Sequence, residues 1–171
     1  MRFYKKSIQI ADCIVFILPI SQLNNNMQMY EFDLVYSEDL GEQLYTDRKL
    51  HCCLNIYRRP KNNILNKKPN YKLKDVTLVE YRRGSNKKPR KEYDYAIGTF
   101  GAGCVGKEIS KCGTYASECY FYINNYKLKD AILNLIKNTN WKSMSKGISN
   151  TYRLPQWRIY KYLKEQIPEL E

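Results

Sequence analysis

Residues 13–18 form an unbroken apolar run, Cys-Ile-Val-Phe-Ile-Leu, which ends at Pro19. Because no polar side chain alternates with the apolar ones, the run predicts a central strand that is buried on both faces of a parallel or mixed sheet, with helices packed on it. A buried helix segment is the alternative, but the run is short and ends at a proline. It is also far shorter than the roughly 20 residues that cross a membrane.

The pattern on either side of this run predicts three further elements in the first part of the chain. Residues 3–11 have the spacing of a short amphipathic helix, and residues 32–36 and 50–57 have the composition of strands. The two strands are separated by residues 37–41, which read as an acidic turn, so we expect them to pair as a hairpin with a long loop.

The second half of the chain predicts strands and helices in alternation. Residues 93–100 and 120–123 are rich in aromatic and β-branched side chains and predict strands. Residues 125–137 carry apolar side chains at helical spacing, residues 141–147 read as a loop, and a last helix is expected from Leu154-Pro155 to about residue 167. The predicted fold class is therefore α/β, and α+β for the chain as a whole.

Positive charge is concentrated after the third predicted strand. The formal net charge is +12, yet residues 1–60 hold seven Lys/Arg and seven Asp/Glu, whereas residues 61–91 alone hold eleven basic and two acidic side chains. A local excess of this size favours a polyanionic partner, which for many proteins is a nucleic acid.

The basic side chains lie in clusters that also contain Pro, Gly and Asn, so we expect exposed loops that follow a phosphate backbone. A solvated basic surface is the alternative. Tyr71 and Tyr81 are expected either to stack on unpaired bases or to pack beneath the loops, and Trp141 is the aromatic residue best suited to stacking. The predicted contacts are Arg58, Arg59, Lys61, Lys67, Lys68, Lys72, Lys74, Arg82, Arg83, Lys87, Lys88, Arg90, Lys91, Lys107, Lys146 and Trp141.

Other candidate sites have plainer interpretations. The glycine cluster 101–106 matches G-x-G-x-x-G, but Cys112-Gly113 and a predicted strand at 120–123 follow where that motif needs a helix. Residues 101–107 match the start of G-x-x-x-x-G-K-[ST], but Glu108 stands where the motif needs Ser or Thr, so we expect a tight turn between strands. His51 adjoins Cys52 in a predicted strand, where neighbouring side chains point to opposite faces, so a nucleophilic pair is not expected. The six cysteines lack metal-ligand spacing and predict reduced, buried thiols. No catalytic, cofactor-binding or metal-ligating residue is predicted.

Three segments together resemble a known enzyme family. The pattern A-D-x-x-x-F-I-L-P at residues 11–19, the segment 94–103 and the segment 117–123 are similar to the rear part of S-adenosylmethionine-dependent DNA adenine-N6 methyltransferases of phages and restriction-modification systems. The resemblance implies a partial Rossmann-like sheet in residues 1–60, a basic loop region in 61–92 and a small α+β DNA-recognition-like module in 93–171.

The same resemblance implies a catalytically incomplete protein. The family's D/N-P-P-Y/F tetrapeptide, which holds the target base, does not occur in this chain. We therefore expect no bound cofactor for this chain alone, although the intact family uses S-adenosylmethionine, and no methyl transfer unless a separate catalytic half acts with it. In that case the activity would be that of a DNA adenine-N6 methyltransferase.

Two classes of function follow from these expectations. The first is a nucleic-acid-binding remnant or half of a methyltransferase, with DNA preferred to RNA as the partner. The second is a phage counter-defence inhibitor, of the anti-CRISPR or anti-restriction type, that binds a nucleic acid or a nucleoprotein complex. We expect a protein partner or self-association to cover an open sheet edge. No export signal or membrane segment is predicted, so the expected location is intracellular, which the resemblance implies to be the cytoplasm of a bacterial host.

Overall fold

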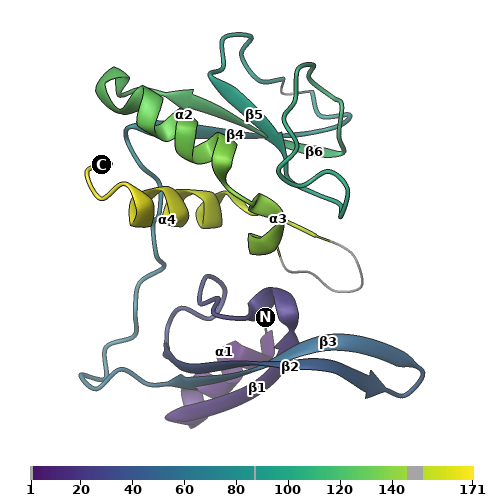
Figure 1. Cartoon of the computed structure of the whole chain (residues 1–171). Coiled ribbons are helices and arrows are strands. Elements are labelled where there is room, and N and C mark those ends of the chain that lie inside the picture. The colour runs from purple at the N-terminus through teal and green to yellow at the C-terminus, as the bar shows by residue number, and fades with distance from the viewer. Residues whose placement is uncertain (1, 87, 146–151) are drawn as a thin grey trace. The chain divides into compact units, whose positions relative to one another are not determined.

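The computed structural model describes residues 2–86, 88–145 and 152–171, and the chain divides between Pro69 and Asn70 into two compact units (Figure 1). Unit 1 comprises residues 2–69, and unit 2 comprises the described residues from 70 onward. Each unit has its own three-stranded antiparallel sheet with helices beside it. The mixed α/β class is confirmed. No helix in the described ranges combines the length and the apolar character needed to cross a membrane.

Unit 1 places a helix, α1 (Arg2–Ile10), before a sheet in the order β1-β3-β2. The strands are β1 (Cys13–Pro19), β2 (Asp33–Tyr45) and β3 (Arg48–Arg58), and a short 3-10 turn, η1 (Ile20–Gln22), follows β1. Both strand pairs are antiparallel, so β3 lies in the centre. The predicted helix and all three predicted strands are confirmed.

One face of this sheet carries the core of unit 1. Tyr4 and Ile8 of α1 pack with Ile14 of β1 and Tyr57 of β3, and the connection after η1 adds Phe32 together with Met29. The hydroxyl of Tyr4 accepts a hydrogen bond from the backbone N–H of Phe32 at 3.2 Å. Burial of the Tyr4 phenol raises its pKa, since the charged form would lose its hydration. The helix is therefore fixed to the sheet by apolar contacts and to the connection before β2 by a hydrogen bond.

The opposite face of the sheet exposes apolar side chains, and this corrects the prediction for residues 13–18. Val15 and Ile17 are 54% and 53% exposed, and Cys13 is exposed as well. The run forms an edge strand with alternating burial, so both the doubly buried strand and the buried-helix alternative are wrong. The described strands pair only antiparallel, which also overturns the expected parallel or mixed sheet.

The second and third strands of unit 1 are longer than their sequence pattern indicates. The acidic segment 37–41 lies inside β2, where the pairing register with β3 shifts between Asp39 and Gly41, so the predicted turn is wrong. The hairpin itself is confirmed, but it closes through Thr46 and Asp47 and has no long loop. Thr46 adopts a positive φ of 52°, as a tight turn requires.

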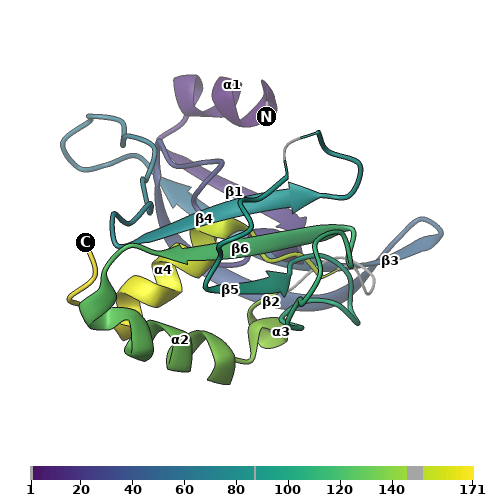
Figure 2. The same cartoon turned by 90° about the horizontal axis from the view of Figure 1, so that it is seen from above.

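Unit 2 contains a sheet in the order β4-β6-β5, with every pair antiparallel (Figure 2). The strands are β4 (Val76–Arg82), β5 (Tyr95–Gly98) and β6 (Ser117–Ile123). The predicted strands at 93–100 and 120–123 are confirmed. β4 falls in the region expected to be basic loops, because flanking Pro, Gly and Lys residues hide its short alternating pattern.

The helical part of unit 2 covers one face of its sheet. The elements are a 3-10 turn η2 (Tyr126–Leu128), α2 (Lys129–Asn138), α3 (Trp141–Met144) and α4 (Gln156–Gln166). Their buried residues form one cluster with Val76, Leu78, Ile97 and Phe121 of the strands. The helices predicted at 125–137 and 154–167 are confirmed, whereas residues 141–144, expected as loop, form α3.

The other face of the unit 2 sheet is lined by tyrosines and covered by loops. Tyr81 of β4 and Tyr120 and Tyr122 of β6 pack there with Ala96 of β5 and with Ile109 of the loop that follows β5. Central strand β6 is thus covered on both faces, and from Glu118 to Ile123 all its residues are buried.

The glycine cluster forms a tight turn between β5 and β6, as predicted. Gly98 donates its N–H to the carbonyl of Lys107, and Gly106 donates back to the carbonyl of Gly98, at 2.9 and 3.0 Å. Gly101 and Gly106 adopt positive φ values of 95° and 80°. A Cβ atom on Gly98 would lie 2.3 Å from the carbonyl oxygen of Cys104, so this position accepts only glycine without backbone movement.

We expect the substitution Gly98→Ala to destabilise unit 2 by about 1–3 kcal/mol, because the added methyl group meets rigid backbone. Gly103→Ala is the matched control in the same turn, since no atom lies within 4 Å of its Cβ position. Urea unfolding monitored by circular dichroism checks both variants. Equal midpoints for the two variants would contradict the close approach of residues 98 and 104.

A second prediction concerns Asp94, which precedes β5. Its Oδ2 accepts the N–H of Ile123 at 2.6 Å, and its Oδ1 lies 2.6 Å from Nζ of Lys129. Burial alone would raise the pKa of Asp94, but these two contacts outweigh it and hold the pKa below its ordinary value of 3.8. The stabilisation is therefore present above that value and is lost as pH falls through the lower, folded-state pKa.

We expect Asp94→Asn to lower the urea midpoint at pH 7, and we expect the gap to wild type to narrow at pH 3. Asp47→Asn is the control, because Asp47 and its partner Arg48 are both exposed and 3.9 Å apart. Urea titrations of the three proteins at both pH values measure the effect. A gap that is independent of pH would show that the charge of Asp94 does not contribute.

Candidate nucleic-acid interface

A groove of about 240 Å³ lies at one end of the unit 2 sheet. Its lining comes from four separate parts of the chain. These are the end of β4, the start of β6 with the residue before it, the segment after β5, and the segment before α4. The lining residues are Glu80, Arg82, Phe100, Ala116, Ser117 and Arg153. The groove therefore combines two cations, one aromatic ring and several polar atoms.

The alternation of side chains along β4 determines which of its residues line the groove. Val76 and Leu78 of β4 face the helices, so Glu80 and Arg82 continue the same face past the helix-covered part. Ser117 pairs with Arg82 across the sheet, and its hydroxyl donates to Oε1 of Glu80 at 3.3 Å. A hydrogen bond of 2.9 Å joins the hydroxyls of Ser117 and Thr99. Polar side chains from β4, from the start of β6 and from the residue after β5 are therefore hydrogen-bonded in one row.

Phe100 and Arg153 are held together by backbone pairing. The N–H of Gly101 donates to the carbonyl of Tyr152, and the N–H of Leu154 donates to the carbonyl of Thr99, both at 2.9 Å. This antiparallel bridge places Phe100 opposite Arg153. Although its neighbour Thr99 is buried, the Phe100 side chain is 41% exposed. The ring is thus presented to solvent on a backbone that is fixed on both sides.

A buried carboxylate holds the loop that leads to Ala116 of the groove. Glu118 is fully buried and accepts hydrogen bonds from the N–H groups of Gly113 and Tyr115 at 2.9 and 2.7 Å. The Tyr120 hydroxyl donates to the same carboxylate at 2.5 Å. Burial, together with Cys112 and Glu118 beside it, raises the pKa of Tyr120, so this phenol stays neutral and remains a donor.

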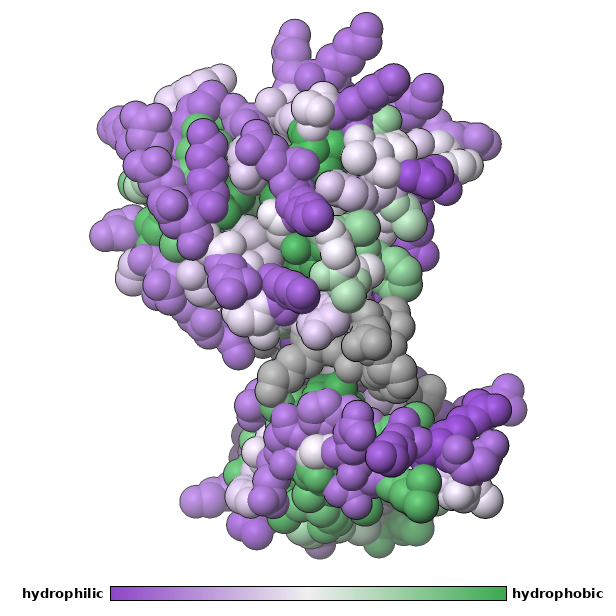
Figure 3. Space-filling model, turned by 45° about the vertical axis from the view of Figure 1, so that its right-hand side comes forward, coloured by the Kyte–Doolittle hydropathy of each residue, from purple (hydrophilic) through white to green (hydrophobic). Residues whose placement is uncertain are grey.

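The predicted basic contacts of unit 2 lie on its surface, and the face displayed in Figure 3 is largely hydrophilic. Arg82 lines the groove with a side chain 64% exposed, and Arg83 donates to the carbonyls of Gly113 and Thr114 in the loop before β6. Lys87 and Lys146 lie outside the described residues. The remaining exposed contacts are Lys72, Lys74, Lys88, Arg90, Lys91 and Lys107.

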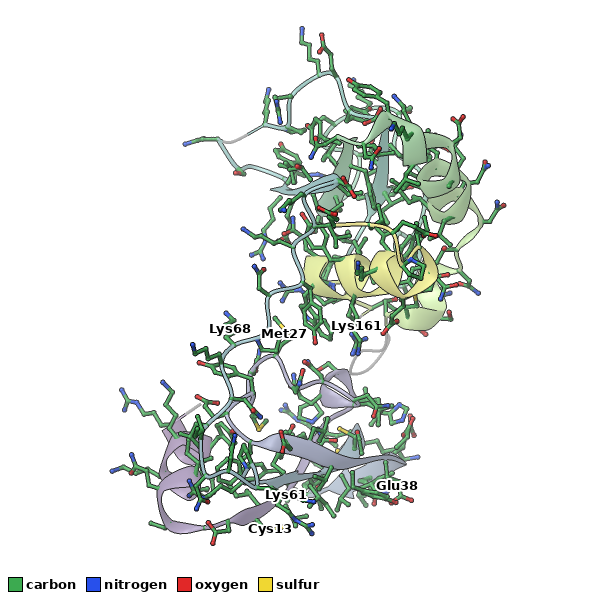
Figure 4. All side chains as sticks on the ribbon, turned by 90° about the vertical axis from the view of Figure 1, so that its left-hand side faces the viewer. Cys13, Met27, Glu38, Lys61, Lys68 and Lys161 are labelled. Atoms are coloured by element: carbon green, nitrogen blue, oxygen red, sulfur yellow. The ribbon has the colours of Figure 1, made fainter. Side chains whose placement is uncertain are left out.

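Five of the predicted contacts belong to unit 1 and so do not share the groove's unit. Arg58, Lys61, Lys67 and Lys68 are exposed, and Figure 4 marks Lys61 and Lys68 on the stretch after β3. Arg59 has a structural role instead. Its Nε lies 2.6 Å from Oδ1 of Asp12, its Nη2 donates to the carbonyl of Ile8, and its guanidinium lies over the ring of Phe32.

The prediction of Trp141 as a stacking residue is wrong. Its side chain is 2% exposed, its Nε1 donates to the carbonyl of Ile136 at 2.9 Å, and its ring packs edge-on against Tyr162. Of the two alternatives for Tyr71 and Tyr81, packing is observed, since Tyr71 contacts Trp157 and Tyr81 is buried. The exposed aromatic ring of the groove is Phe100, which the sequence pattern assigns only to a strand.

His51 and the six cysteines are the other residues that the sequence singles out as candidates for chemistry. The Nε2 of His51 lies 2.6 Å from Oδ1 of Asp39, which fits the structural role expected for this histidine. All six cysteines are free, as expected, although Cys13 and Cys112 are exposed where buried thiols were predicted. No group of three His, Cys, Asp or Glu side chains is placed to hold a metal ion among the described residues.

We expect Glu118→Gln to destabilise unit 2 by about 1–3 kcal/mol, because the amide would turn an N–H₂ group towards backbone or hydroxyl donors. Glu92→Gln, at an exposed position, is the control. Hydrogen exchange of the Gly113 and Tyr115 amides, with urea unfolding alongside, measures the loss. Unchanged protection at both amides would contradict the role of Glu118 as the anchor of this loop.

Comparisons with known proteins identify no relative from which a function could be inferred. No protein-family model matches the chain, and neither a curated protein nor a solved structure shows significant similarity to it. The methyltransferase resemblance therefore stays a prediction. The candidate interface is defined by the geometry and charge of unit 2.

Proposed function

We propose that unit 2 binds nucleic acid through the groove and the basic loops beside it. The observation that supports this proposal is the presence of Arg82, Arg153 and the exposed ring of Phe100 in one groove with polar side chains. Arginines pair with phosphate oxygens, and an exposed aromatic ring stacks on an unpaired base. A ligand with both features is a nucleotide or a nucleic-acid strand.

The charge of unit 2 favours a polymer over a free nucleotide. Residues 70–171 carry 19 Lys/Arg against 10 Asp/Glu. Asp94 and Lys129 form an ion pair and cancel each other, so the excess of positive charge is carried by the other side chains. The exposed cations at residues 83, 88, 90, 91 and 107 are additional phosphate contacts along a strand that passes the groove.

A merely solvated basic surface is the alternative to this proposal. Such a surface needs no aromatic ring held in the open by paired backbone, whereas Phe100 is fixed by its bridge to Arg153 and remains exposed. The ring and the two arginines come from three segments far apart in sequence. Their convergence favours a binding role over simple solubility.

The ancestry and partners proposed from the sequence remain proposals. A methyltransferase origin, a role as half of such an enzyme and a counter-defence role are all compatible with nucleic-acid binding, but the antiparallel sheets lend the first no support. A second copy or a protein partner remains a proposal for the edges of the unit 1 sheet, which are β1 and β2. We expect no transfer of labelled methyl groups from S-adenosylmethionine to DNA by this chain alone.

The test is the salt dependence of binding to a short single-stranded DNA, measured by fluorescence anisotropy. Replacing Arg82 and Arg153 together by Ala is expected to weaken binding at low salt at least tenfold, since hydrogen bonds to charged groups contribute about 1.5–3 kcal/mol each. The log-log salt slope is expected to fall by about 0.7 for each lost phosphate contact.

Arg48→Ala is the matched control, because Arg48 is an exposed arginine of unit 1. It is expected to leave both the affinity and the slope unchanged. Wild-type protein that shows no salt-dependent binding would overturn the proposed function. If R48A weakened binding as much as the double variant, the groove would not be the binding site.

A further inference from the structure

The groove contains a hydrogen-bond acceptor that a phosphate-binding site does not need. Glu80 lines the groove with 36% of its side chain exposed, and two groups fix its Oε1. The hydroxyl of Ser117 donates to this oxygen at 3.3 Å, and Nε and Nη2 of Arg82 both lie 3.4 Å from it. A carboxylate held in this way is oriented and has acceptor capacity left over.

The arginines reduce the electrostatic cost of a carboxylate in an anion-binding groove. Arg82 offsets the charge of Glu80 through its Nε and Nη2 and keeps its other N–H groups for a phosphate, and Arg153 adds a second positive charge. A phosphate can therefore approach Arg153 without strong repulsion from Glu80. The free acceptor capacity of Glu80 is then available to another part of a ligand in the groove.

The part of a nucleotide that shares the groove with Glu80 depends on Phe100. Its exposed ring lines the same groove as Glu80, so a base that stacks on the ring shares the groove with the carboxylate. An ionised carboxylate only accepts hydrogen bonds, and it therefore selects a base edge that donates them. Cytosine, adenine and guanine carry exocyclic amino groups, whereas uracil and thymine do not.

We propose that the groove is a subsite for one unpaired nucleobase that carries an exocyclic amino group, with Phe100 as the stacking surface and Glu80 as the acceptor for the amino hydrogens. This proposal rests on the proposed function, because it names the part of the nucleic acid that enters the groove. Bases inside a duplex are stacked on their neighbours and cannot lie on Phe100, so the ligand is a single strand or an unpaired nucleotide.

The test compares oligo-dC with oligo-dU of equal length, because the two bases are similar in size and differ in the exocyclic group that Glu80 would contact. Fluorescence anisotropy at fixed salt gives the affinities of wild type and variants. We expect wild type to bind oligo-dC more tightly than oligo-dU, by about 5- to 100-fold. We expect Glu80→Gln to bind the two with nearly equal affinity, since an amide also donates to the uracil carbonyl.

Phe100→Ala is expected to weaken oligo-dC binding by about 5- to 100-fold through the loss of stacking. Phe3→Ala and Glu42→Gln are the matched controls, because both residues are exposed on unit 1. Circular dichroism of each variant establishes that it is folded before its affinity is used.

The outcomes separate this proposal from the proposed function. A preference for oligo-dC that Glu80→Gln abolishes and Phe100→Ala weakens supports both. Equal, salt-dependent binding of the two strands by wild type overturns the base subsite and leaves nucleic-acid binding intact. A preference that Glu80→Gln does not change also overturns it. If neither strand binds, both proposals are overturned.

Discussion

Unit 2 depends on the burial of its central strand. β6 is hydrogen-bonded to β4 on one edge and to β5 on the other, helices cover one of its faces, and tyrosines with loops cover the other. Such a strand must satisfy every polar group it buries, and Glu118 does so through backbone N–H groups and the Tyr120 hydroxyl. The requirement for satisfied hydrogen bonds thus orders the loop before β6, and this loop supplies Ala116 to the groove.

The sequence indicates a doubly covered strand, but at the wrong place. The run 13–18 is more apolar than β6, yet it lies at a sheet edge with one face exposed, because unit 1 has only α1 and a short connection to cover its three strands. In β6, alternation of Tyr with Phe and Cys conceals burial on both faces, since tyrosine is ambiguous between core and surface. The apolar content of a segment therefore does not predict whether one or both faces of its strand are covered by other elements.

Helix positions are predicted well for the opposite reason. The apolar spacing of residues 125–137 and 154–167 reports directly on the face that packs against the sheet, and α2 and α4 form there. The groove is harder to predict because its residues are brought together by sheet register. Arg82 stands out as part of a charge cluster, but Arg153, Phe100 and Glu80 carry no sequence signal of their own. Only the pairing of β4 with β6 and of Phe100 with Arg153 identifies them as neighbours.

The assembly of the groove from four chain segments separates two properties of the surface. Net positive charge is a property of the chain, so it persists when unit 2 unfolds. The juxtaposition of Phe100, Glu80 and Arg153 exists only while the ends of the strands are paired. Under the proposed function, we therefore expect attraction to a polyanion to survive urea or heat that abolishes discrimination between bases. In partly unfolded protein, the remaining affinity for a polyanion would then reflect electrostatics, and the preference between bases would reflect the fraction of the unit 2 sheet that is still folded.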